Sequence, residues 1–144
     1  MTSSTSDNQR ANPTGQGGLR GIILLYHGSA GREWLQNAEW MARIVAGAAP
    51  MAAVRIGCLK EFSPSLKDAA AALAQAGAVT VLVVPMFIAP GGHSTRDFPP
   101  LADGLKKRWP EIDFIWTEVV GAWDEVAEAV AAGLKNRLDQ RETQ

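Results

Sequence analysis

Two histidines, His27 and His93, are the residues of this chain with the clearest capacity for chemistry. Each follows a run of apolar residues, Gly21–Tyr26 in the first case and Val81–Ile88 in the second, and each lies beside glycine. A neutral imidazole binds first-row transition metals and also accepts a proton near neutral pH. We therefore expect both histidines to project into one site.

The two apolar runs determine where the histidines lie. An apolar run that does not alternate with polar residues and ends in a turn is typical of a strand buried on both faces of a parallel sheet. Ligands bind just beyond the carboxyl ends of such strands. Because the histidines are far apart in the sequence, the strand topology has to bring them together. If the two strands are neighbours, both imidazoles face one metal ion and leave coordination positions open.

Four predicted strands alternate with four predicted helices. The expected strands are 21–26, 51–59, 79–84 and 112–117, and the expected helices are 33–48, 64–76, 99–109 and 122–139. This alternation predicts an α/β fold, a three-layer sandwich in which a four-stranded parallel sheet carries helices on both faces, with right-handed crossovers and flavodoxin-like winding.

Local signals set several boundaries. Ser63 is expected to cap the second helix, with Pro64 in its first turn, and Gly77 to end it. Residues 86–97 are expected to form a long loop. The last helix is expected to pack on the sheet through an inner face that consists of Val126, Ala129, Val130, Gly133 and Leu134.

The composition predicts one domain after a polar tail. A chain of 144 residues supports one domain, which we place at 20–140, and residues 1–19 are expected to be disordered. A formal net charge of -1 gives no general attraction to nucleic acid or to an anionic membrane. Cys58 is the single cysteine and is interpreted as a small buried residue. A reducing compartment fits a lone thiol. No apolar run is long enough to span a bilayer, and the first residues lack the apolar core of a signal peptide, so we expect a cytoplasmic protein.

Residues beside the histidines are candidates for ligand binding. Glycines allow the backbone to approach a flat ligand closely, although simple turn formation explains them equally well. The Met-Phe pair before His93 either forms an apolar wall for a large aromatic ligand or continues the buried strand. These candidate binding residues are Gly28, Ser29, Met86, Phe87, Gly91 and Gly92.

Three motifs resemble one known family. They are His27-Gly28-Ser29 after the first strand, Pro64-Ser65-Leu66 at the second helix, and the Val-Val-Pro-Met-Phe-Ile…Gly-Gly-His block that ends at His93. Together they are similar to the small sirohydrochlorin chelatases, the class II tetrapyrrole chelatases of the CbiX/SirB type. The resemblance runs from about Gly21 to the final helix.

This resemblance implies a chelatase-type α/β fold and a lyase activity. The implied reaction inserts a divalent metal substrate, cobalt or else iron or nickel, into sirohydrochlorin without ATP and without an organic cofactor. Its products would enter cobalamin or siroheme biosynthesis, or become a nickel tetrapyrrole. The resemblance assigns metal binding to His27 and His93 and implies a homodimer.

One departure from the family pattern concerns proton transfer. Family members often carry a glutamate just before the Pro-Ser-Leu motif, and that register falls on Lys60 here, with Glu61 as its neighbour. The proton acceptor is therefore a histidine, Glu61 or a carboxylate of the substrate. Cations that could meet the acidic side chains of the substrate are Arg32, Lys60 and Arg96.

Two other functions remain open. A non-catalytic metal-binding or tetrapyrrole-binding module of the same fold is the main alternative, and it is favoured by Lys60 in place of the family glutamate. A phosphate-ester hydrolase with a histidine nucleophile ranks last. Such enzymes surround the phosphate with arginines, and no arginine lies within four residues of His27.

Overall fold

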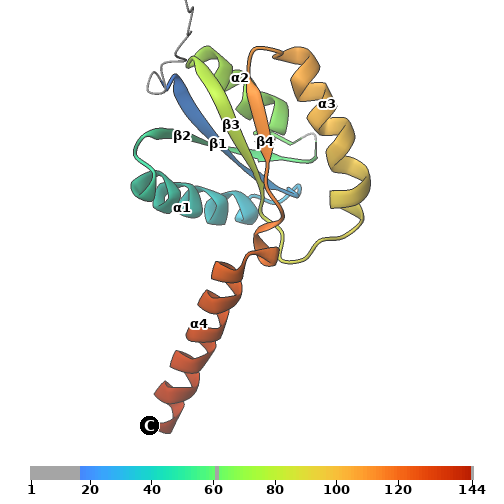
Figure 1. The fold of residues 1–144 in the computed structure, drawn as a ribbon. Helices are drawn as coiled ribbons and strands as arrows, with labels where there is room; N and C mark the ends of the chain where they lie inside the picture. The colour runs from blue at the N-terminus through green and yellow to red at the C-terminus, as the bar shows by residue number, and fades with distance from the viewer. Residues whose placement is uncertain (1–16, 61, 144) are drawn as a thin grey trace, which may run out of the picture.

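The computed structural model describes residues 17–60 and 62–143, with the backbone alone for His93 and Ser94. Its four strands form one parallel sheet in the order β2-β1-β3-β4 (Figure 1), which confirms the predicted fold class. The elements are β1 (Leu19–Tyr26), α1 (Glu33–Ala48), β2 (Ala52–Cys58), α2 (Leu66–Gln75), β3 (Ala78–Pro85), η1 (His93–Asp97), α3 (Phe98–Arg108), β4 (Asp113–Trp116), η2 (Val120–Ala122) and α4 (Asp124–Glu142).

Strand β1 lies in the middle of the sheet because it pairs with β2 on one side and with β3 on the other. Its residues Ile23, Leu24 and Leu25 are almost completely buried, as expected for a strand covered on both faces. The strand begins at Leu19, inside the range expected to be tail, and residues 1–16 of that range lie outside the described part of the chain.

The helices cover the two faces of the sheet unequally. The main core joins α2 and α3 to one face, where alternate strand residues such as Ile23, Val81 and Val83 point. Leu24 and Val84 are also buried but lie outside this core, because they point to the opposite face. Helix α1 contacts β1 and β2 on that face. Helices therefore lie on both faces, as predicted.

Helix α2 begins two residues later than expected. Its N-cap is Ser65, whose hydroxyl accepts a hydrogen bond from the Asp68 backbone N–H, while the Asp68 carboxylate accepts one from the Ser65 N–H. This reciprocal pair is a capping box, so the prediction that Ser63 caps the helix is wrong. After the helix, Gly77 has φ +87°, the left-handed conformation that commonly ends a helix.

The segment between β3 and α3 is partly helical. We expected a loop over residues 86–97, but His93–Asp97 form a wide π-helical turn that leads directly into α3. None of the described helices is both long enough and apolar enough to cross a membrane.

Helix α4 forms as predicted but does not pack as predicted. None of its residues is buried, and its main contacts are with η2. Figure 1 shows it leaving the domain beyond the carboxyl ends of the strands. The expected inner face is therefore exposed to solvent or half-exposed, and the prediction that it covers the chain's own sheet is wrong.

The turn before α4 explains its direction. The Gly121 N–H donates to the Phe87 carbonyl at 2.9 Å, and a Cβ added at Gly121 would collide with the Ile88 carbonyl. The η2 turn is thus held against the backbone that leaves β3. The chain enters α4 from this point, directed away from the sheet.

Leu73 of α2 provides a test of this core. It is 0% exposed, and replacing a fully buried leucine by alanine removes contacts and leaves a cavity. We expect Leu73→Ala to lower the free energy of unfolding by about 2–5 kcal/mol, measured by urea denaturation with circular dichroism. Gln75→Ala, at an exposed position of the same helix, is the control and should change it by less than about 0.5 kcal/mol.

Candidate functional site

The fold brings the backbones of both histidines to one edge of the sheet. β1 and β3 are parallel neighbours whose register pairs Leu25 with Pro85, so their carboxyl ends lie together. His27 directly follows β1, and His93 begins the helical turn after β3. The predicted convergence of the two segments is thus observed. Binding of one metal ion by both imidazoles stays a prediction, because the structure describes only the backbone of His93.

A cavity of about 410 Å³ opens beside His27. The segment after β2 contributes Lys60, and η1 contributes Arg96 and Asp97, all exposed, while apolar residues of α3 close one wall. Two cations and one carboxylate therefore lie around the imidazole. This arrangement suits an acidic ligand that approaches the carboxyl edge of the sheet.

The segment that carries His27 is fixed by close packing. Gly28 has φ +80°, and a Cβ there would lie 2.8 Å from the Cβ of Cys58, so glycine is required for two separate reasons. The Trp34 Nε1–H donates to the Ser29 carbonyl at 3.1 Å, and the Trp34 ring packs against Tyr26 with centroids 6.0 Å apart. Helix α1 thereby holds the loop that follows β1.

The orientation of the His27 ring has a chemical consequence. Its Nδ1 lies 3.1 Å from the Gly28 carbonyl oxygen, which can only accept, so Nδ1 carries the proton in this contact. A neutral imidazole with a proton on Nδ1 has its lone pair on Nε2, the nitrogen through which it can bind a metal or accept a proton.

Cys58 organises the segment after β2. Its sulfur lies 3.1 Å from the carbonyl oxygens of both Lys60 and Phe62, toward which the thiol donates, and its backbone N–H donates to Pro64 at 3.0 Å. Burial raises the pKa of the Cys58 thiol, which keeps the donor protonated. The sequence correctly predicted a small buried residue, at 1% exposure, but gave no sign of this hydrogen bonding.

Glu61, the candidate proton acceptor, lies outside the described residues. The candidate glycines near His93 lie just before η1 and accept hydrogen bonds from it: the Thr95 N–H donates to the Gly91 carbonyl at 3.4 Å and the Thr95 hydroxyl to the Gly92 carbonyl at 3.3 Å. A Cβ at Gly91 would meet nothing within 4 Å, so space for a ligand exists there. Close approach of a flat ligand to these glycines stays a prediction.

The Met-Phe pair continues the core. The Met86 N–H donates to Leu25 at 2.8 Å, which extends the pairing of β3 with β1. The Phe87 ring stacks on Phe98 with centroids 5.9 Å apart and packs against the main core. The geometry favours continuation of the strand for both residues. Arg32, another candidate, is not among the residues that line the cavity beside His27.

An apolar cavity that the sequence did not indicate lies on the other side of the first turn of α3. It measures about 530 Å³, and Pro90, Phe98, Trp116 and Val119 are among its lining residues. The Trp116 Nε1–H is buried without a hydrogen-bond partner among the described residues. These residues come from separate segments of the chain, so only the folded chain reveals the cavity.

Comparison with known proteins now decides the family. Residues 21–137 match the CbiX family. The chain belongs to the CbiX family. It is 30% identical to the sirohydrochlorin cobaltochelatase of Sulfurisphaera tokodaii over 85% of this chain and 93% of the relative. It is 31% identical to that of Saccharolobus islandicus over 85% of this chain and 98% of the relative.

Solved structures of CbiX-type proteins share the fold. The CbiX protein of Marinobacter aquaeolei VT8 superposes with a TM-score of 0.73 at 26% identity, covering 84% of this chain and 98% of that one. The sirohydrochlorin chelatase SirB of Bacillus subtilis subspecies spizizenii, solved in complex with cobalt, has a TM-score of 0.70 at 23% identity. That match covers 82% of this chain and 50% of SirB. The resemblance seen in the sequence is therefore confirmed.

The Cys58 thiol predicts how stability depends on pH. Because its pKa is raised in the folded state, the unfolded chain loses this proton first as pH rises above about 8.5. The free energy of unfolding of the native chain should therefore fall above that pH. Cys58→Ala should be less stable by about 1–2 kcal/mol near pH 7, and the difference should shrink toward pH 10.

Urea denaturation of both chains between pH 7 and pH 10 measures this effect. Burial also raises the pKa of Tyr26, but Tyr26 is present in both chains and cancels in the difference. Cys58→Ser is the control, because it keeps a hydrogen-bond donor at this position but has no thiol that titrates in this pH range. A difference that stays constant over the whole range contradicts the assignment.

Proposed function

We propose that this chain is a sirohydrochlorin chelatase, a lyase that inserts a divalent metal into sirohydrochlorin without ATP or an organic cofactor. Cobalt is the metal we favour, because the two relatives described above are named cobaltochelatases, and iron or nickel are alternatives. The observation that supports the proposal most is the placement of His27 beside a cationic cavity at the sheet edge where the His93 segment begins.

In this proposal the metal substrate binds first to the two histidines. The Nδ1–H of His27 points at the Gly28 carbonyl, so its Nε2 is the metal-binding nitrogen. Two imidazole ligands leave coordination positions for the nitrogens of the macrocycle. The macrocycle loses two N–H protons as one divalent ion enters, so charge is conserved. A histidine, Glu61 or a carboxylate of the substrate accepts these protons.

In this proposal the cavity beside His27 and the apolar cavity bind different parts of the substrate. Sirohydrochlorin carries acidic side chains, which Lys60 and Arg96 bind through charge-assisted hydrogen bonds. The guanidinium of Arg96 also lies near Gly92, where an added Cβ would be 3.5 Å from Nη2, so Arg96 links the cavity to the segment of His93. The apolar cavity beside Phe98 and Trp116 receives a face of the macrocycle.

The proposal includes a homodimer in the cytoplasm. The chain covers about half of SirB, and pairing of two copies would supply a second sheet and a second edge. A lone buried cysteine that forms no internal disulfide fits a reducing compartment. The products would enter cobalamin or siroheme biosynthesis.

Removal of either histidine tests the reaction. His27→Ala and His93→Ala should each slow insertion of cobalt(II) into sirohydrochlorin by at least about 100-fold, because each removes a metal ligand. The absorbance change of the tetrapyrrole measures the rate. Arg43→Ala, at an exposed position of α1 that does not line the cavity, is the control and should stay within about twofold.

The same assay separates the enzyme from a binding module. If the native chain binds sirohydrochlorin or cobalt(II) without accelerating insertion, the chelatase proposal is wrong and the non-catalytic module is supported. Insertion that is unaffected by both substitutions would place the reaction elsewhere on the chain.

Lys60 and Arg96 are expected to act in substrate binding. Lys60→Gln and Arg96→Gln should each raise KM for sirohydrochlorin by about 10-fold, with kcat within about twofold, because a charge-assisted bond to a remote carboxylate stabilises substrate and transition state alike. Steady-state kinetics at fixed ionic strength measure both constants. Lys67→Gln, exposed on α2 away from the cavity, is the matched control, and an equal effect there would refute the assignment.

A further inference from the structure

Asp97 is a carboxylate in the proposed metal-binding region that the proposed reaction does not use. It is exposed and lines the cavity beside His27. It is also the last residue of the η1 turn, which begins at His93. Asp97 therefore belongs both to the turn that carries one histidine and to the cavity that contains the other.

The spacing of Asp97 from His93 is that of two ligands on one helical turn. Residues four apart lie on the same side of a helix, and ligand pairs at this spacing bind a single ion in helical metal sites. The π-helical turn of η1 keeps this relation, because one turn of such a helix takes roughly 4.4 residues. The backbone positions of residues 93 and 97 are therefore on one side of η1, and Asp97 lines the cavity from that side.

Helix capping does not explain why an aspartate stands at this position. Asp97 is the N-cap residue of α3, and a capping carboxylate accepts a hydrogen bond from the backbone N–H of the second or third helical residue. In α3 these residues are Pro99 and Pro100, and proline has no N–H to donate. The Asp97 side chain accordingly makes no capping hydrogen bond. The helix therefore does not require this carboxylate, which lines the cavity instead.

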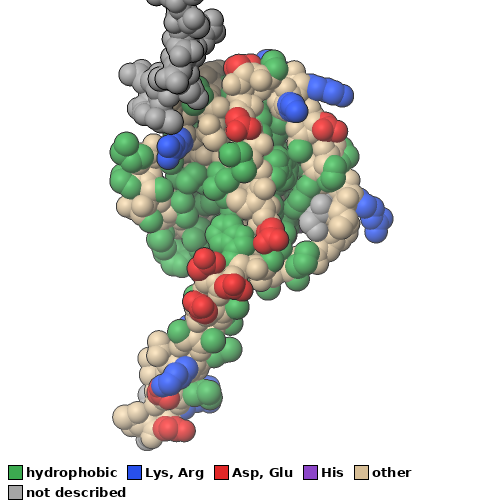
Figure 2. All heavy atoms as spheres, viewed as in Figure 1, with side chains coloured by type: hydrophobic (Ala, Val, Ile, Leu, Met, Phe, Trp, Pro, Cys, Tyr) green, Lys and Arg blue, Asp and Glu red, His purple; other side chains and the backbone are tan. Residues whose placement is uncertain are grey.

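The charges around the cavity favour a role for this carboxylate in binding a cation. Lys60 and Arg96 line the same cavity, and both repel a divalent metal ion. Among the described residues that line it, Asp97 is the one carboxylate. Figure 2 shows that other acidic side chains gather around the start of α4, where Asp124 and Glu125 form the first turn. Asp97 is thus the acidic group in position to offset the two cations when a metal ion enters.

We propose that Asp97 is a third ligand to the metal substrate, which it binds together with His27 and His93. This inference rests on the proposed function for the two histidines, and it adds one carboxylate oxygen to their two nitrogens. Two imidazoles and one carboxylate bind divalent first-row metals and leave coordination positions open on the opposite side of the ion. Those positions are available to the nitrogens of the macrocycle.

The third ligand also fits the transfer of the metal to the macrocycle. A carboxylate lowers the net charge of the loaded site by one, so a dication is stabilised in a cavity that Lys60 and Arg96 also line. During transfer the bond between the metal and the Asp97 oxygen breaks as bonds between the metal and the ring nitrogens form. The metal keeps its charge, and the two N–H protons of the ring leave to the acceptors named above, so the step needs no redox partner.

Titration of the full chain with cobalt(II) alone, without a tetrapyrrole, tests the assignment. Asp97→Asn keeps the size of the side chain but removes its charge, and it should weaken cobalt(II) binding by at least about 10-fold. The visible absorption of the bound cobalt(II) should change as well, because it depends on the set of ligands. Asp97→Glu, which keeps a carboxylate, should bind cobalt(II) more tightly than Asp97→Asn does. If the amide variant does not fold, Asp97→Ala replaces it with the same expected result.

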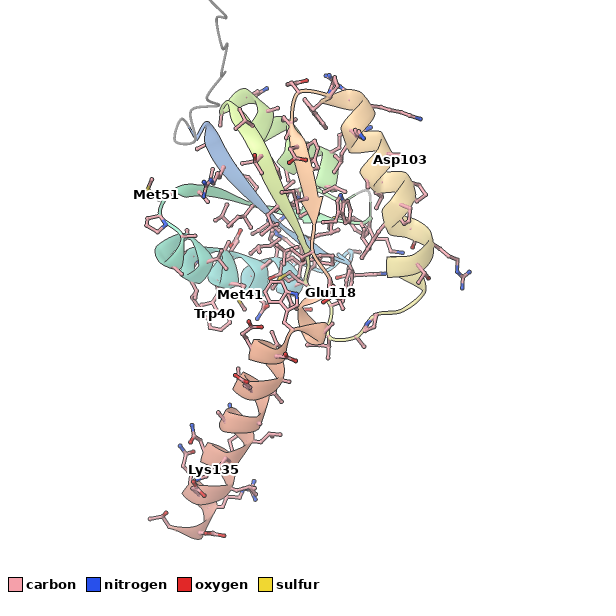
Figure 3. The ribbon with its side chains drawn as sticks, viewed as in Figure 1. Trp40, Met41, Met51, Asp103, Glu118 and Lys135 are labelled. Carbon is pink, nitrogen blue, oxygen red and sulfur yellow. The ribbon has the colours of Figure 1, made fainter. Side chains whose placement is uncertain are left out.

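Asp103→Asn is the matched control for this titration. Figure 3 shows Asp103 on α3, where it is exposed and lines a different cavity. The control should change the affinity for cobalt(II) by less than about twofold. Equal effects at the two positions overturn the proposal, and so does an Asp97→Asn chain with native affinity and native cobalt(II) absorption. Circular dichroism of each variant checks that it is folded.

The histidine variants keep this inference separate from the proposed function. If His27→Ala and His93→Ala lose cobalt(II) binding while Asp97→Asn keeps it, the third ligand is wrong and the chelatase proposal stands. If Asp97→Asn weakens binding but the native chain does not accelerate insertion into sirohydrochlorin, the chelatase proposal is wrong and the third ligand stands. A native chain that binds no cobalt(II) overturns the third ligand.

Discussion

The parallel register of β1 between its two neighbours is the constraint on which the rest of the structure depends. Backbone pairing sets Tyr26 opposite Cys58 on one side and Leu25 opposite Pro85 on the other. Three segments therefore leave the sheet at one edge, and each carries residues of the site. Since side chains of a strand alternate between faces, a shift of one residue would turn the apolar core outward. The core thus maintains the register, and the register positions the histidine segments.

A second contact joins two of these segments directly. Gly28 and Cys58 touch where a side chain at position 28 would not fit, and the thiol of Cys58 holds the carbonyls of the turn that carries Lys60. The position of a cation beside His27 is therefore set by a small buried residue that does not itself line the cavity. The apolar cavity on the other side of α3 has a similar origin, because Phe98 and Trp116 pack with centroids 5.3 Å apart and form both core and cavity wall.

The sequence predicted those features that depend on local pattern. The apolar run before His27 gave the central strand, and helical periodicity gave the bounds of α1 at Glu33 and Ala48. It could not show that Ser65 rather than Ser63 caps α2, since both precede the helix and only the backbone conformation selects one. The sequence also could not show the direction of α4, because its apolar stripe is the same whether the helix packs on the sheet or leaves the domain. The strand order explains why His27, Lys60 and Arg96 lie together. The hydrogen bonds of the Cys58 thiol, in contrast, could be seen only in the structure.

Gly121 is far from the histidines in the sequence, yet its contacts help to fix the backbone near His93. The Ile88 carbonyl occupies the space where any other residue would place its Cβ, so a larger residue must displace either the start of α4 or the backbone that leads to His93. The position of Gly121 therefore couples the long helix to the segment that carries His93. Variation at Gly121 would therefore change the direction of the long helix and the backbone around the histidine together.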